Sequence, residues 1–154
     1  MLAGLAVASP SHTFAADCQM AVSTQEALAF SRPAAGSVIK EFGDQYDEIL
    51  RARQFHGGVD LDGPEGEQVY AARSGKVIEA GKKGDLGLYV RIAHGAGVET
   101  GYGHLSAISV SAGECITGGR QIGKIGATGR TPGPRLHFEV LRDGKPVNPL
   151  GYLQ

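Results

Sequence analysis

The chain contains five histidines, and four of them lie beside glycines or at the expected ends of strands: His56, His94, His104 and His137. Functional side chains often project from such places. The fifth, His12, lies in the N-terminal segment and is set aside. Two histidines and one carboxylate suit a catalytic zinc ion, which keeps a fourth position open for water. A further histidine nearby can act as a base or stabilise an oxyanion, so these residue types indicate metal-assisted hydrolysis.

His56 and Asp60 form the first candidate pair, in the sequence FHGGVD. In a straight strand four residues span about 13 Å, whereas two ligands of one zinc ion lie about 3–3.5 Å apart. The two residues can share a metal only if the chain bends at Gly57-Gly58, where glycine tolerates positive φ angles. The spacing alone favours the simpler interpretation, a loop histidine and a surface aspartate.

The segment RLHFEV, residues 135–140, has the alternation of a half-buried strand. Residues two apart in a strand share a face and lie about 7 Å apart, so Arg135 and His137 face the same groove or solvent. The apolar residues of this segment face the core, and the polar residues face away from it: Leu136, Phe138 and Val140 in the first set, and Arg135, His137 and Glu139 in the second.

The remaining histidines also end predicted strands. His104 follows Gly101-Tyr102-Gly103, and outside a site it would be a surface or capping residue. His94 ends a strand and opens the HGAG turn, and for it we favour a structural role.

Short β-strands are the elements that must position these residues. The 24 glycines lie between short apolar runs, which indicates tight turns and a mainly β, antiparallel fold. Gln19 to Phe30 has the apolar spacing of a short helix, with Ser23 or Thr24 as its N-cap. The strands are expected at residues 38–42, 58–61, 68–71, 75–80, 88–93, 99–105, 121–127 and 136–142, and residues 142–145 are expected to form a turn before a tail packed on the sheet.

The composition excludes several classes of protein. The net charge is -1 and the charged residues are interspersed, so no nucleic-acid partner is expected. No apolar run approaches the roughly 18 residues of a transmembrane segment. A length of 154 residues fits one domain, which is expected to be a monomer.

The N-terminus allows two interpretations. Residues 1–16 have a short apolar stretch followed by small residues, as in an export signal, but they lack a basic start, and the alternative is an alanine-rich tail. A lipoprotein signal fits less well because Asp17 precedes Cys18. Cys18 and Cys115 form a disulfide if the compartment is oxidising, and otherwise they are two thiols.

From about Arg32 to Leu153 the chain resembles peptidase family M23, the lysostaphin/LytM-type zinc endopeptidases that cut peptidoglycan peptides. The resemblance lies in the order and spacing of six segments: FHGGVDLDGPEG, VYAARSGKV, HGAGVETGYGHLS, GRQIGKIGATGR, GPRLHFEV and NPLGYL. It implies an antiparallel β-sheet with a substrate groove and one Zn²⁺ at the floor of that groove. We therefore divide the chain into a leader (1–16), an N-terminal helical segment (17–31) and an M23-like domain (32–154).

The resemblance also assigns roles to individual residues. The zinc ligands of the family match His56, Asp60 and His137, whose ligand atoms should converge on a point about 2 Å from each. One catalytic histidine of the family matches His104. The second is the first residue of an H-x-H pair, and this chain has Arg135 there.

Arginine keeps some abilities of histidine and loses one. It donates hydrogen bonds and carries positive charge, but it stays protonated and cannot act as a base. Two hypotheses follow: a zinc endopeptidase acting on peptidoglycan cross-links, or a catalytically impaired M23 domain that binds peptidoglycan or regulates another cell-wall hydrolase. Both imply an exported protein of the periplasm or cell envelope, with peptidoglycan stem peptides or cross-bridges as the partner. A third interpretation, a structural β domain, accounts for fewer of the motifs.

Overall fold

The computed structural model describes Cys18 and residues 30–153. The helix expected over 19–30 and the leader expected over 1–16 fall almost wholly outside the described residues, so both stay predictions, as do the segment boundaries at 17 and 32. No helix in the described part of the chain is long and apolar enough to cross a membrane.

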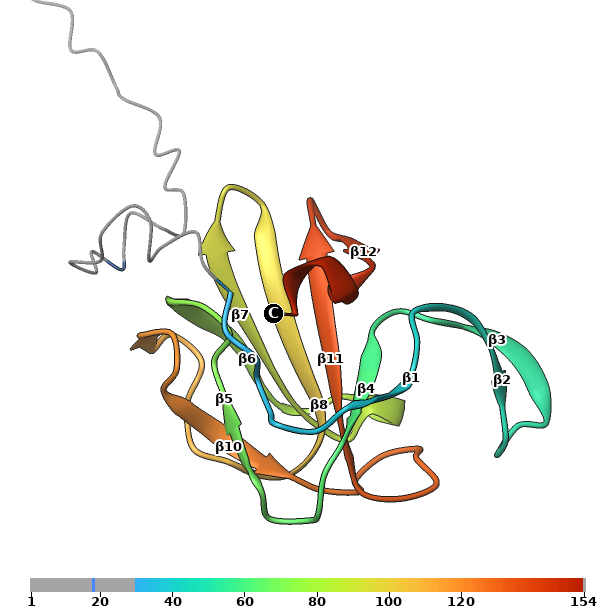
Figure 1. Ribbon diagram of the computed structural model, residues 1–154. Coiled ribbons are helices and arrows are strands. Elements are labelled where there is room, and N and C mark those ends of the chain that lie inside the picture. The colour runs from blue at the N-terminus through green and yellow to red at the C-terminus, as the bar shows by residue number, and fades with distance from the viewer. Residues whose placement is uncertain (1–17, 19–29, 154) are drawn as a thin grey trace, which may run out of the picture.

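The described part of the chain is mainly antiparallel β-structure, as predicted (Figure 1). Every strand pairing in it is antiparallel. The elements are β1 (Val38–Lys40), β2 (Gly43–Asp47), β3 (Ala52–His56), β4 (Val59–Asp62), β5 (Gln68–Tyr70), β6 (Gly75–Lys82), η1 (Gly84–Leu86), β7 (Leu88–Gly95), β8 (Val98–Ile108), β9 (Cys115–Ile116), β10 (Gln121–Ile125), β11 (Arg135–Arg142), β12 (Lys145–Val147) and η2 (Pro149–Tyr152).

The larger sheet has the strand order β1-β4-β11-β8-β7-β6-β9. The long strand β8 changes partner along its length, since residues 98–103 pair with β11 and residues 105–108 pair with β10. Strand β10 also pairs with β5. The apolar core contains side chains from the main run of strands and from the β5–β10 pair. Examples are Phe138 of β11, Val69 of β5 and Ile122 of β10, all fully buried. The core face of β11 thus contains the residues that its alternation predicted.

Three parts of the sheet structure were not predicted: the β2–β3 hairpin, the edge strand β9, and strand β12 within the tail expected to pack on the sheet. Strands β2 and β3 form a separate two-stranded sheet that projects beside β1 (Figure 1). The sequences of its strands, GDQYD and ARQFH, lack the apolar alternation of a half-buried strand, and its large apolar side chains are exposed, Tyr46 at 56% and Phe55 at 58%. Strand β9 has only two residues and pairs with β6 at the edge of the large sheet.

The turn predicted at residues 142–145 is confirmed. Asp143 and Gly144 have φ angles of 51° and 79°, as in a two-residue hairpin turn that twists with its strands. It joins β11 to β12, and Val147, Tyr152 and Leu153 then pack against the core. The C-terminal tail therefore covers the sheet as expected.

Cys18 and Cys115 form a disulfide, which resolves the alternative left open by the sequence. The bond joins Cys18 to β9, the strand at the edge of the sheet farthest from β1 and β4.

Candidate metal centre

Side chains of His56, Asp60 and His137 converge on one point. His56 Nε2 lies 3.1 Å from Asp60 Oδ1 and 3.1 Å from His137 Nδ1, and the latter two atoms lie 2.8 Å apart. Ligands at about 2.0 Å from a tetrahedral ion lie about 3.3 Å from one another. The three atoms therefore have nearly the spacing that one small metal ion requires.

Three strands bring these residues together. Strand β3 ends at His56 and β4 begins at Val59, so the chain leaves the small sheet and enters the large one across Gly57-Gly58. Within the large sheet, β4 pairs with β11 so that Asp60 lies directly opposite His137. The predicted bend between His56 and Asp60 is present.

The physical reason for the glycines differs from the one predicted. Neither Gly57 nor Gly58 has a φ angle in the left-handed region. A Cβ atom on Gly58 would lie 2.4 Å from the carbonyl oxygen of Phe138 and 2.9 Å from Cε1 of His137. Gly58 is therefore required by the close approach of β11, and not by a special φ angle.

Hydrogen bonds on the far side of each histidine ring fix which nitrogen faces the centre. His56 Nδ1 lies 2.8 Å from the Glu41 carbonyl oxygen, and His137 Nε2 lies 3.0 Å from Glu139 Oε1. Because both partners accept hydrogen bonds, these nitrogens carry the protons. The nitrogens at the centre then present lone pairs, which meet an oxygen of Asp60. Three converging acceptors need a proton or a cation between them, so the donor set fits a metal ion.

The electrostatics of the centre favour a cation as well. Burial alone would raise the pKa of Asp60, but the two histidines hold it far below its usual value when a proton, in place of an ion, lies between their nitrogens and Asp60 Oδ1. Burial would lower the pKa of His137, but hydrogen bonds and the charges of Asp60 and Glu139 raise it to about 9. The field that favours a proton on His137 also favours a metal ion in its place.

His104 lies beside this centre, with its ring centroid 5.8 Å from that of His137. Strand β8 changes partner at this residue, and His104 has a φ angle of 59°, a strained value for a residue with a Cβ atom. Its Nδ1 donates to the Thr128 carbonyl oxygen at 2.8 Å, which leaves Nε2 with a lone pair. Burial is the main cause that lowers its pKa, so His104 is neutral near pH 7 and able to accept a proton.

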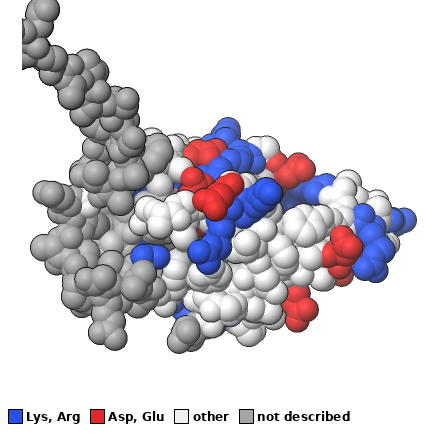
Figure 2. All heavy atoms as spheres, turned by 90° about the horizontal axis from the view of Figure 1, so that it is seen from above, with Lys and Arg blue, Asp and Glu red and all other residues white. Residues whose placement is uncertain are grey.

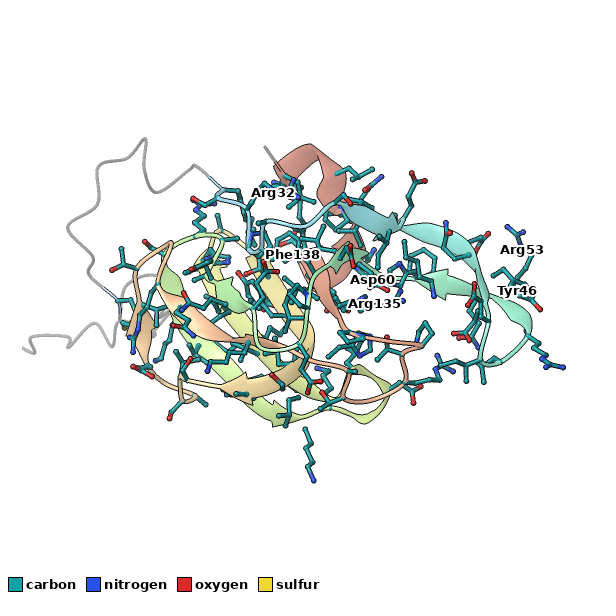
Figure 3. The ribbon with its side chains drawn as sticks, turned by 60° about the horizontal axis from the view of Figure 1, so that its bottom comes forward. Arg32, Tyr46, Arg53, Asp60, Arg135 and Phe138 are labelled. Carbon is teal, nitrogen blue, oxygen red and sulfur yellow. A yellow bond between two sulfur atoms is a disulfide. The ribbon has the colours of Figure 1, made fainter. Side chains whose placement is uncertain are left out.

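Arg135 points toward the centre, as the alternation of β11 predicted. Its Nη1 donates to Asp60 Oδ2 at 3.2 Å, whereas the two histidines contact Asp60 Oδ1. Figure 3 labels both residues, Asp60 on β4 and Arg135 on β11. The guanidinium is therefore held at the second oxygen of Asp60 and leaves Oδ1 free for a metal. Among the described residues, the buried Nε of Arg135 has no hydrogen-bond partner.

A groove with a volume of about 330 Å³ opens over these residues. His56, Asp60, His104, Arg135 and His137 all line it. Its walls come from the β2–β3 hairpin, from the η1 segment and from residues 130–132. Arg130 links two walls, with Nη2 3.3 Å from Gln54 of the hairpin and 3.7 Å from the Asp85 carboxylate. The five candidate residues thus share one accessible site.

His94 lies outside this site. Its Nδ1 contacts the Ser74 carbonyl oxygen and its Nε2 contacts Thr100 Oγ1, at 2.8 and 2.7 Å. It belongs to a buried polar network, which agrees with the structural role favoured for it. Sequence reasoning placed Glu139 on the face of His137 but assigned no role to Tyr89, whose hydroxyl donates to Glu139 Oε2 at 2.8 Å.

Comparison with known proteins gives the family. The model of peptidase family M23 matches residues 54–149. The chain belongs to peptidase family M23. This M23 chain is 41% identical over 125 residues to the DD-carboxypeptidase/endopeptidase Mpg of Neisseria meningitidis, covering 81% of the chain and 28% of the relative. It is 43% identical over 93 residues to the peptidoglycan DD-endopeptidase ShyB of Vibrio cholerae, covering 60% of the chain and 22% of the relative. The chain thus spans less than a third of each relative.

Solved structures agree with this M23 assignment. A zinc-containing peptidase from Vibrio cholerae superimposes with a TM-score of 0.72 at 35% identity, over 78% of this chain and 39% of the other. The catalytic domain of lysostaphin from Staphylococcus simulans superimposes with a TM-score of 0.69 at 28% identity, over 76% and 91% of the two chains. The fold is therefore that of the lysostaphin-type M23 peptidases.

Proposed function

We propose that this chain is a zinc-dependent endopeptidase that hydrolyses the peptide cross-links of bacterial peptidoglycan. The observation that carries the proposal is the convergence of His56 Nε2, Asp60 Oδ1 and His137 Nδ1 in the lining of a groove in an M23 domain. Support for the substrate comes from the relatives, one of which is a peptidoglycan DD-endopeptidase. A zinc ion bound there would polarise the scissile carbonyl and acidify water.

His104 is the general base of the proposed reaction. Its Nε2 accepts a proton from the attacking water, while the hydrogen bond from Nδ1 to Thr128 keeps the ring oriented. The lowered pKa of His104 keeps this nitrogen unprotonated near neutral pH.

Arg135 is the residue that stabilises the oxyanion in this proposal, as an electrophilic partner of His104. It is already ordered by Asp60, and a guanidinium has further N–H groups that can donate to the oxyanion of a tetrahedral intermediate. Because Arg135 keeps its charge, it needs no proton from solvent before it can donate. In this proposal His104 alone moves the proton, from the attacking water to the nitrogen of the amine that leaves, and Arg135 stabilises the charge that develops.

Hydrolysis of purified peptidoglycan by the zinc-loaded protein tests the proposal, with products identified by mass spectrometry. We expect cleavage of cross-linked muropeptides by the parent protein, none after chelation or in His137→Ala, and recovery when zinc is added back to the parent. Glu99→Gln is the matched control, because this carboxylate pairs with Arg91 and touches none of the proposed ligands. A zinc-loaded parent that leaves cross-links intact would refute the enzyme.

One observation favours a second function. An arginine replaces a residue that the family resemblance makes catalytic, and it pairs with a proposed metal ligand. The alternative is a catalytically impaired M23 domain that binds zinc and peptidoglycan or regulates another cell-wall hydrolase. It predicts that the parent protein sediments with peptidoglycan without cleaving it, and that Arg135→His cleaves it.

The proposed substrate requires an exported protein of the periplasm or cell envelope. The Cys18–Cys115 disulfide supports this location, since disulfides persist in oxidising compartments. On the face shown in Figure 2, basic and acidic side chains are interspersed, which fits a partner other than nucleic acid.

A further inference from the structure

Glu139 lies between the proposed ligand His137 and the buried residue Tyr89. Its Oε1 accepts from His137 Nε2 at 3.0 Å, and its Oε2 accepts from the Tyr89 hydroxyl at 2.8 Å. Each carboxylate oxygen therefore has one donor, and the carboxylate can neither rotate nor shift without losing one of them. Two strands contribute these side chains, since His137 and Glu139 are on β11 and Tyr89 is on β7, with β8 between the two strands.

The strand between them leaves room for this contact. Glu139 on β11 lies opposite Gly101 on β8, and Gly101 lies opposite Arg91 on β7. A Cβ atom on Gly101 would lie 2.2 Å from the Tyr89 hydroxyl oxygen and 2.8 Å from Glu139 Oε2. Only glycine at this position lets the tyrosine reach across β8 to the carboxylate.

The surroundings hold Tyr89 in place as a donor. It is only 1% exposed, and the Lys83 ammonium lies 4.7 Å from the centre of its ring while pairing with Glu79. Burial, followed by the charge of Glu139, raises the pKa of Tyr89 well above its usual value, so the hydroxyl keeps its proton.

We propose that Glu139 and Tyr89 are positioning residues for the metal centre, acting through His137. Glu139 fixes the proton of His137 on Nε2, which directs the Nδ1 lone pair at the metal, and Tyr89 fixes Glu139. The inference rests on the proposed zinc site, but it concerns residues that touch neither the metal nor the substrate.

Arg135 makes the negative charge of Glu139 more important for metal affinity. One oxygen of Asp60 is shared with the Arg135 guanidinium, which offsets part of the only negative charge among the three ligands. Glu139 adds a second negative charge on the other side of His137. Partners that orient a ligand and raise its basicity in this way typically change metal affinity 10- to 100-fold when they are removed.

Zinc dissociation constants of the full chain, measured by competition with a chelator at fixed pH, test the inference. Glu139→Gln keeps the size of the side chain but removes the charge, and it should weaken zinc binding roughly 10- to 100-fold. Tyr89→Phe removes only the hydroxyl and should weaken binding by a smaller factor. The visible spectrum of the cobalt-loaded protein should change in Glu139→Gln, because His137 is no longer held in one orientation.

Two matched controls separate positioning from folding. Glu99→Gln neutralises a carboxylate paired with Arg91 on the same strand as Gly101, and Tyr102→Phe removes a buried hydroxyl bonded to Ala72 and Thr100. Both can lower the melting temperature of the metal-free protein, but neither should change zinc affinity.

Zinc affinities in Glu139→Gln and Tyr89→Phe that equal the parent value would overturn the inference while leaving the proposed function intact. Equal losses of affinity in the two controls would overturn it too, since the effect would then be one of general stability. A parent that binds no zinc would refute the proposed function and this inference together.

Discussion

At the scale of single residues, the question is whether Arg135 disables the centre or serves it. The guanidinium neither turns to solvent nor occupies the metal position, because it pairs with Asp60 Oδ2 at 3.2 Å. Its side chain is 15% exposed, so one edge remains open to the groove. The substitution therefore removes a possible base but leaves a fixed donor beside the metal.

Arg135→Ala tests this role. Without the donor, turnover of cross-linked muropeptides should fall about 10²- to 10³-fold, as when an oxyanion donor is lost. Zinc content should not fall, because Arg135 contributes no ligand atom and its charge offsets part of that of Asp60. Arg135→Lys should recover part of the loss. Turnover of Arg135→Ala equal to that of the parent would show that Arg135 has no part in the reaction.

His94 should make stability depend on pH. The Ala72 N–H donates to the Tyr102 hydroxyl, and the Tyr102 hydroxyl donates to Thr100 Oγ1. Thr100 in turn donates to His94 Nε2, and His94 Nδ1–H donates to the Ser74 carbonyl oxygen. A second ring proton, on Nε2, would therefore face the hydroxyl hydrogen of Thr100 and break this hydrogen bond. Burial is the main cause that lowers the pKa of His94 to about 4, and the nearby Arg73 charge adds to it.

The pKa of His94 is lower in the folded state than the unfolded value of about 6.5. The contribution of His94 to the free energy of unfolding is therefore complete above pH 6.5. It decreases as pH falls from 6.5 toward 4, by up to about 1.4 kcal/mol per pH unit. Urea denaturation of the metal-free protein between pH 7 and pH 4 should show a steeper loss in the parent than in His94→Gln. Equal slopes for the two proteins would contradict this account of the network.

At the scale of elements, the centre depends on the passage of the chain from β3 to β4. The alternation in RLHFEV predicted β11 correctly, because its apolar face contacts the core, and Arg135 and His137 on its polar face line the groove. The β2–β3 hairpin could not be predicted in the same way, because its apolar side chains face solvent. The contact of Glu139 with Tyr89 also lies beyond prediction, since it passes over Gly101 from a strand two positions away.

Gly58→Ala and Gly57→Ala form a matched pair of variants in the connection between β3 and β4. A Cβ atom on Gly58 would overlap the backbone of β11, whereas the nearest atom to a Cβ on Gly57 is 3.8 Å away. Gly58→Ala should lower the free energy of unfolding by about 1–3 kcal/mol and weaken zinc binding, because β4 and β11 must separate. Gly57→Ala should change stability by no more than about 0.5 kcal/mol. Chemical denaturation measures both, and equal effects would contradict the close-approach explanation.

At the scale of the whole molecule, the metal centre and the disulfide lie toward opposite ends of the sheet. The ligands are on β3, β4 and β11, whereas Cys115 is on β9, at the edge beyond β6. The sequence predicted the fold class, the strands of Asp60 and His137 and, through the family resemblance, the convergence of the three side chains, but not strand β3, where His56 lies. It left the disulfide open, because two cysteines 97 residues apart give no geometric information until the sheet is formed.

Cys18→Ser should therefore separate stability from metal binding. A bond that closes a loop of about 100 residues stabilises the fold by up to about 4.7 kcal/mol in the chain-entropy account. Loss of the bond should lower the melting temperature clearly while zinc affinity stays within about twofold of the parent value. A large loss of zinc affinity in Cys18→Ser would show that the two ends of the sheet are coupled.

The most direct test of the central claim is a comparison of zinc-loaded parent and Arg135→His in single-turnover hydrolysis of a cross-linked muropeptide dimer. With His104 as the base and Arg135 as the electrophilic partner, the parent should cleave the dimer at a rate within about tenfold of that of Arg135→His. Cleavage by Arg135→His together with none by the zinc-loaded parent would contradict the account and identify the domain as a binding or regulatory one.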